Sequence, residues 1–210
     1  MAEIILDTQT VPATPGAGVA KGYFDSTLNT WKSVDPGGSA WNYQPVWMIS
    51  QSANFTGANS TAAQPIFNAT AAGTVTLPAS TTFIMDACIH IDTVGVTSHT
   101  FGVLFGGTAT LTSIGYQATV TNAATEVLGG TQTIWIAVAT VAVLTAATAT
   151  ATHHTLTING TVRTNGAGTF IPQYQWGTNA PGTAGVTLAN SYFKLTQQGT
   201  NTTVNIGPWT

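Results

Sequence analysis

Four histidines and seven carboxylates are the side chains from which this 210-residue chain could build a catalytic or metal site. A metal site needs imidazoles and carboxylates at spacings that let them converge, such as i and i+2 on one face of a strand. His90 and Asp92 have that spacing. His99 stands alone, and the adjacent His153 and His154 would face opposite sides of a strand. We therefore expect surface or subunit-contact imidazoles and no cofactor or metal, with an ion on an oligomer axis as the alternative.

Nucleophilic and acid–base catalysis find no better support. The chain has no G-x-S-x-G motif, and Cys88 is its single thiol, with no partners in a recognisable order. A glycosidase needs two acids at one groove, and beyond the first 37 residues the only acids are Asp86, Asp92 and Glu126. These patterns indicate a protein that is not an enzyme.

The chain carries very little charge. Charged residues make up 5% of it, against about a quarter in ordinary soluble proteins. The 41 threonines supply polarity instead, and their branched side chains favour strands. The net charge is −3 with four permanent cations, so no basic face for phosphates is expected and nucleic acid is excluded as a partner.

Cysteine usage and hydropathy bear on whether the protein is exported, disulfide-bonded or inserted in a membrane. One cysteine excludes an internal disulfide. The first residues, MAEIILDTQ, are acidic and only briefly apolar, unlike a secretory signal, so we expect use without Sec export. The apolar run at residues 134–144 is too short for a membrane helix, which needs about 20 residues. Its valine and isoleucine content favours one or two buried strands, and no membrane partner is expected.

Alternating apolar and polar residues predict an all-β body. In residues 82–93 the apolar set from Phe83 to Ile91 falls on one face, and Ile84 and His90 fall on the other. Residues 153–176 alternate in the same way on both sides of an Asn-Gly-Ala-Gly turn, which predicts a β-hairpin. Turns at short intervals and the lack of amphipathic helices favour an antiparallel jelly-roll β-sandwich of about eight strands.

Residues 1–37 differ from the body at residues 38–210. They contain six of the eleven charged residues, several Pro and Gly residues, and at 21–35 a loosely alternating segment that predicts a small β-ribbon. We expect an extended arm and ribbon that dock on a partner, because the arm has too few apolar residues to fold alone. The candidate partner-binding residues of this segment are Glu3, Ile4, Ile5, Leu6, Asp7, Val11, Tyr23 and Phe24.

A β body with so little surface charge risks pairing with other chains at its edges. Burying threonine- and alanine-rich faces between subunits removes that risk, so we expect a homotrimer. The candidate residues of the trimer interface are Ile84, Cys88, His90 and Trp209.

Several short motifs resemble structural proteins of tailed bacteriophages. The N-terminal element is similar to a P-x-x-G-x-x-x-x-Y-x-D-S-T pattern, and the body is similar to trimeric tumour-necrosis-factor and C1q heads. The matching residues are Pro15, Gly18, Tyr23, Asp25, Ser26, Thr27, Gly160, Gly168, Thr169, Ile171, Pro172, Tyr192, Phe193, Gly207 and Trp209.

The resemblance implies a virion protein, and two roles compete. Fibre proteins of this kind carry long N-terminal anchors, whereas only residues 1–37 precede this body. The short arm favours a capsid decoration, or cement, protein that binds the major capsid protein as a homotrimer on the capsid exterior, after assembly in the host cytoplasm. The alternative is a fibre protein that recognises a host-surface glycan. A host-derived cytokine-like or lectin module would carry an export signal.

Overall fold

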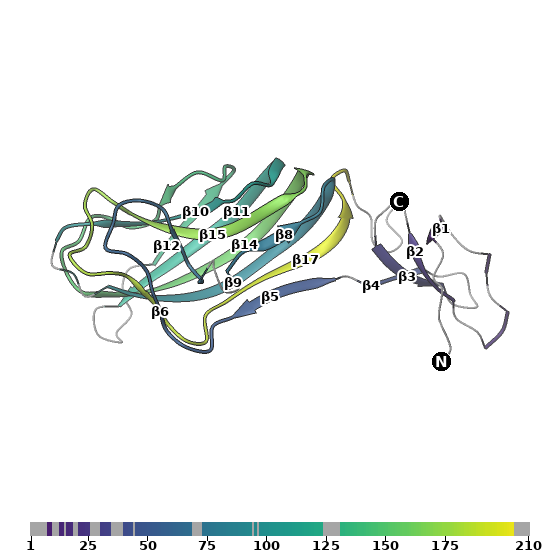
Figure 1. The fold of residues 1–210 in the computed structure, drawn as a ribbon, viewed down its shortest axis with the longest axis horizontal. Helices are drawn as coiled ribbons and strands as arrows, with labels where there is room; N and C mark the ends of the chain where they lie inside the picture. Colours follow the sequence, from purple (N-terminus) through teal and green to yellow (C-terminus); the bar gives the residue numbers. More distant parts are fainter. Residues whose placement is uncertain are drawn as a thin grey trace.

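The structure is a computed structural model in which the described residues form strands and turns, with no helix among them. It describes residues 8–9, 13–14, 16–18, 21–25, 30–34, 40–43, 45–68, 73–93, 95, 97–123 and 131–203. These residues build a small sheet at one end and a two-sheet sandwich beside it (Figure 1). The expectation of an all-β protein is confirmed.

The small sheet, here the N-terminal sheet, has the strand order β1-β2-β3-β4. Its strands are β1 (Thr8–Gln9), β2 (Lys21–Asp25), β3 (Thr30–Val34) and β4 (Ala40–Tyr43). The ribbon predicted at residues 21–35 is confirmed, because β2 and β3 pair antiparallel. The sheet extends past the predicted boundary at residue 37, since β4 pairs with β3 and the sandwich begins with β5.

The larger sheet of the sandwich, here the large sheet, is built around β9. On one side of β9 the strands follow in the order β14, β11, β12. On the other side, β17 and β16 pair with successive parts of β9, β5 pairs with β17, and β6 pairs with β16. The strands are β5 (Val46–Ser50), β6 (Phe55–Thr56), β9 (Thr81–Thr93), β11 (Thr110–Ala123), β12 (Thr131–Ile136), β14 (Thr152–Gly166), β16 (Val186–Thr187) and β17 (Tyr192–Thr200).

The second layer, here the opposing sheet, has the order β13-β10-β15-β7, with β8 also pairing with β15. Its strands are β7 (Gln64–Pro65), β8 (Val75–Leu77), β10 (Thr100–Gly106), β13 (Ala142–Val143) and β15 (Gly168–Gly177). The described body thus has eight strands of at least five residues, as expected for an antiparallel sandwich. The jelly-roll order of connections stays a prediction.

The hairpin predicted at residues 153–176 is wrong, although both of its strands exist. β14 pairs with β9 and β11 in the large sheet, and β15 pairs with β10, β7 and β8 in the opposing sheet. The chain therefore crosses between layers at Ala167, and the two strands belong to opposite sheets. Gly168 permits the close approach, since a Cβ there would lie 2.5 Å from the backbone nitrogen of Ala109.

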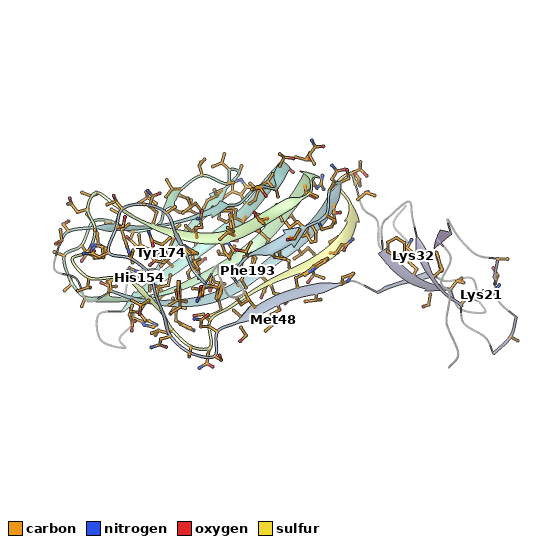
Figure 2. All side chains as sticks on the ribbon, in the orientation of Figure 1. Lys21, Lys32, Met48, His154, Tyr174 and Phe193 are labelled. Atoms are coloured by element: carbon orange, nitrogen blue, oxygen red, sulfur yellow. The ribbon has the colours of Figure 1, made fainter. Side chains whose placement is uncertain are left out.

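The core lies between the two sheets and follows the predicted alternation. Phe83, Met85, Ala87, Ile89 and Ile91 of β9 are all buried, which confirms their assignment to the core face. Side chains from β14 and β17 continue this layer beneath those of β15, and Figure 2 shows His154, Tyr174 and Phe193 in the sandwich.

Two histidines are buried at one end of this core. The ring of His154 stacks on Phe101 at a centroid distance of 4.8 Å, and His99 meets the edge of Trp176 at 5.1 Å. Nδ1 of His99 lies 2.8 Å from the carbonyl oxygen of Thr97, to which it can donate a hydrogen bond. Burial, with the nearby His99 and His153, lowers the pKa of His154 from 6.5 to about 3. Between about pH 3 and pH 6.5, the folded protein therefore keeps His154 neutral, whereas an unfolded chain would protonate it.

The first prediction concerns stability against pH. Folding lowers the pKa of His154, so only the unfolded chain protonates it between about pH 6.5 and pH 3. The free energy of unfolding is therefore highest above about pH 6.5 with respect to this group, and it falls as the pH drops towards 3. The expected slope from this group is about 1.4 kcal/mol per pH unit in that window. The variant His154→Leu should lose this part of the slope in urea unfolding between pH 7 and pH 4. Thr157→Ser, at an exposed position on the outer face of the same strand, is the control, and an unchanged slope in His154→Leu would contradict the assignment.

Candidate interaction sites

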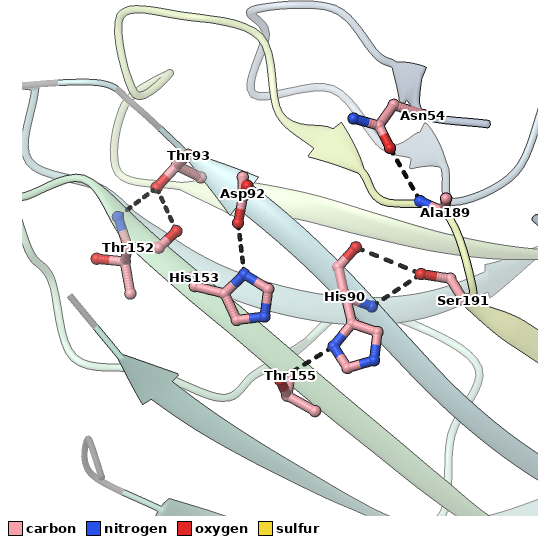
Figure 3. Close-up of polar contacts among 9 residues, drawn as sticks. All are labelled: Asn54, His90, Asp92, Thr93, Thr152, His153, Thr155, Ala189 and Ser191. Atoms are coloured by element: carbon pink, nitrogen blue, oxygen red, sulfur yellow. Dashed lines mark hydrogen bonds and ion pairs between the residues drawn. The ribbon is translucent and has the colours of Figure 1, made fainter. Parts of the chain in front are cut away.

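Polar side chains gather on the outer face of the large sheet, where β9 and β14 run side by side (Figure 3). The register places His153 opposite Asp92, and Nδ1 of His153 lies 2.5 Å from a carboxylate oxygen of Asp92. Nδ1 of His90 lies 3.2 Å from the hydroxyl of Thr155. The two imidazoles stack at a centroid distance of 5.6 Å. The predicted common face of His90 and Asp92 is therefore present, and His153 joins it from the next strand.

Cys88 and His90 form the pair in this cluster that most resembles a nucleophile and its base. Their Sγ and Nε2 atoms are 3.8 Å apart. Burial, and then the charge of Asp86, raises the pKa of the Cys88 thiol. Burial and the nearby His153 lower the pKa of His90, against the opposite effect of Asp92. Both shifts favour the neutral thiol and neutral imidazole, so the pair is not the ion pair of an activated cysteine.

Neither a hydroxyl nor a metal site completes the cluster. The hydroxyl of Ser191 is buried and accepts a hydrogen bond from the backbone N–H of His90 at 2.9 Å. This hydroxyl therefore has a structural role in joining β9 to the residue before β17. Within the described residues, no group of three or more His, Cys, Asp or Glu side chains is placed to hold a metal ion. The cluster as built is a polar surface, on which Asp86 also pairs with Lys194 at 3.7 Å.

The candidate interface residues divide between this face and the undescribed C-terminus. Ile84, Cys88 and His90 lie on the outer face of β9, as the alternation predicts, and Ile84 is exposed. Trp209 lies outside the described residues. The outer face is thus available to another molecule, and its role as a trimer interface stays a prediction.

The candidate docking residues of the N-terminal segment are mostly beyond what the structure describes: Glu3, Ile4, Ile5, Leu6, Asp7 and Val11. Tyr23 is 3% exposed in the single chain. Phe24 is half-buried. The partner-binding role of the N-terminal segment stays a prediction.

An apolar groove, which the sequence did not reveal, lies between the edges of the two sheets. It has a volume of about 550 Å³, and its walls come from β5, β8, β15 and β17. Met48 and Val46 on the rim are 59% and 55% exposed, while Phe193 and Leu195 form part of its floor. None of the described residues that line it is charged.

A second apolar surface lies at the opposite edge of the sandwich, after β12. Val138, Val141 and Val143 are between 43% and 52% exposed, and we call them the valine edge. Trp135 of β12, 70% exposed, lies nearby on the outer face of the large sheet. The segment 134–144 does form two strands in part, as expected, but the expectation that it is buried is wrong for these side chains. Val138 and Val141 lie in the connection between β12 and β13, and Val143 lies on the face of its sheet that the other layer does not cover.

Comparison with known proteins places the chain in no family. No family model, no curated protein and no solved structure matches it. In the described part of the chain, no helix is long and apolar enough to span a membrane.

The second prediction concerns Cys88. Because its pKa is raised, its thiol should react with iodoacetamide at pH 7.5 more slowly than free cysteine does, and His90→Ala should change the rate by less than about twofold. Mass spectrometry of the alkylated protein gives the rate, and labelling in urea controls for access. A faster reaction that is lost in His90→Ala would instead show an activated pair.

Proposed function

We propose that the chain is a virion structural protein that decorates the outer shell of a capsid as a homotrimer and stabilises it. The observation that carries the proposal is the division into two separately built units, an N-terminal sheet and a sandwich. The sandwich offers exposed apolar surfaces with few charges, which is typical of surfaces that other proteins cover. The resemblance of several short sequence motifs to phage structural proteins suggests a virion as the location of the protein.

In this proposal the two units divide the work. The sandwich associates with its own copies, and the N-terminal unit, with the apolar residues that precede β1, docks on the major capsid protein. Three docking segments on one rigid trimer bind together, so that modest single contacts give a high combined affinity. An extended apolar segment can add a strand to an open sheet edge of the shell.

The alternative is a fibre protein that recognises a glycan, and one observation favours it. The indole of Trp135 leans over Gly115, where a Cβ would lie 2.8 Å from its ring, and the ring remains largely exposed. An exposed indole beside polar Gln117 could stack on a sugar ring while amide and hydroxyl groups meet its hydroxyls. Trp135→Ala would then abolish binding to glycan arrays and leave shell binding unchanged.

A reconstruction of the particles that contain this protein separates the two roles. Density at three-fold positions over the shell supports decoration, whereas density confined to the tail tip would overturn it in favour of the fibre. Immunogold labelling gives the same distinction at lower resolution.

The third prediction concerns the residues ahead of β1. Deleting residues 1–7 should abolish binding to shells that lack the protein and leave its oligomeric state unchanged, because β1 to β4 and the sandwich remain complete. Co-sedimentation with shells measures binding, and light scattering after gel filtration measures the oligomer. Ile4→Ser with Ile5→Ser is the milder matched variant, expected to weaken binding in the same direction. Loss of the oligomer on deletion would contradict this division of roles.

A further inference from the structure

We propose that the outer face of the large sheet carries a binding site for neutral pyranose chains, formed by the indole of Trp135 and the amides of Gln117 and Asn159. The inference goes beyond the proposed function, because it concerns β11, β12 and β14 alone and holds whether the sandwich lies on a shell or on a fibre. The outer face of β9, with the candidate trimer residues Ile84 and His90, stays free for another copy.

The strand register places the three side chains in one row. Trp135 of β12 lies opposite Gln117 of β11, and Gln117 lies opposite Asn159 of β14. All three are exposed on the outer face, whereas their strand neighbours Ala118 and Ile158 are buried in the core. Paired strands lie about 4.8 Å apart, so the indole and the two amides follow one another at nearly equal steps over about 10 Å.

The indole of Trp135 is held against the sheet and is still open to solvent. The far end of its ring occupies the space above Gly115, where an added Cβ would lie 2.8 Å from the ring. Covering a strand glycine is a structural role that aromatic rings often have, but it uses only part of the ring. Trp135 remains 70% exposed, so most of the indole is available to a ligand.

The groups beside the indole are hydrogen-bonding and uncharged. Within the described residues, the side-chain amides of Gln117 and Asn159 make no hydrogen bond to the protein, and each offers donors and an acceptor in one plane. Threonine hydroxyls flank the row at exposed positions: Thr133, Thr157 and Thr161. The charge that follows in the row is that of Asp86, opposite Asn159, and Lys194 pairs with it at 3.7 Å.

This combination of groups favours a sugar over other ligands that stack on an indole. A pyranose ring with equatorial hydroxyls presents C–H groups on both faces, which pack on an aromatic ring, while its hydroxyls point outwards to planar amides. A nucleic-acid base would also stack, but its phosphates need cations that a chain of net charge −3 does not supply. An uncharged row likewise favours a neutral sugar over a sialylated one.

The test measures the affinity of the full-length protein for cellotetraose and chitotetraose by titration calorimetry. Both are neutral, β-linked chains with equatorial hydroxyls, and at least one should bind the wild type at millimolar concentration or below. Trp135→Ala should weaken that binding at least about tenfold, because the stacking surface is lost. Gln117→Ala and Asn159→Ala should each weaken it roughly threefold to tenfold. Failure of the wild type to bind either chain would overturn the proposal.

Met48→Ala is the matched control for Trp135→Ala. Met48 is 59% exposed and lies on the same outer face at the β5 end of the row, next to Lys194. Its removal should leave the affinity unchanged, and a loss as large as that in Trp135→Ala would move the site to β5 and overturn the assignment. Urea unfolding midpoints close to that of the wild type verify that the variants are folded. Tighter binding of sialyllactose than of either neutral chain would overturn the neutral class of ligand.

Gly115→Ala tests the positioning of the indole. The added methyl group should push the ring from its place and weaken sugar binding, and it should add no further loss in a protein that already carries Trp135→Ala. A further loss in the double variant would show that Gly115 acts on the fold and not through the indole.

The outcome is separable from that of the decoration role. Sugar binding that depends on Trp135, in a protein that never locates to shells, would overturn the proposed function and leave this site standing. A protein that decorates shells and binds neither chain would overturn the site and leave the proposed function standing.

Discussion

The structure depends on the layer of aromatic side chains that joins the two sheets of the sandwich. Phe105 of β10 stacks on Phe170 of β15 at 5.0 Å and meets the edge of Tyr116, from β11 of the large sheet, at 5.1 Å. With charge so scarce, burial of this layer is the main source of stability for the sandwich. Phe170 and Phe193 continue the layer between β15 and β17. The outer polar face, the groove and the valine edge keep their positions because this layer fixes the sheets on one another.

The sequence was sufficient for features that depend on alternation within one strand. The period of two in β9 assigned Phe83 and Ile91 to the core, and the adjacency of His153 and His154 placed them on opposite faces. Both results follow from pleat geometry, which needs no knowledge of the neighbours. The common face of His90 and Asp92 was predicted for the same reason.

Features that depend on which strands pair could not be predicted in this way. A Gly-containing turn between two alternating strands is equally compatible with a hairpin and with a crossing between sheets, and here β14 and β15 bury their apolar faces towards each other. The contact of His153 with Asp92 depends on the register of β14 on β9, and the burial of Tyr23 depends on the packing of the N-terminal sheet. The groove and the valine edge arise because β5, β8, β12 and β13 end the sheets, a property of strand order alone.

The abundance of threonine explains why such edges persist. A threonine hydroxyl can hydrate a strand or bond across it, as Thr119 of β11 does with Thr133 of β12 at 3.0 Å, without adding charge. Threonine therefore makes the faces of the sheets polar without adding the charge that would deter another strand from pairing at an edge. Its branched side chain also favours the extended backbone that such pairing requires. A sandwich that is hydrated by hydroxyls in place of charges remains open to association at its edges.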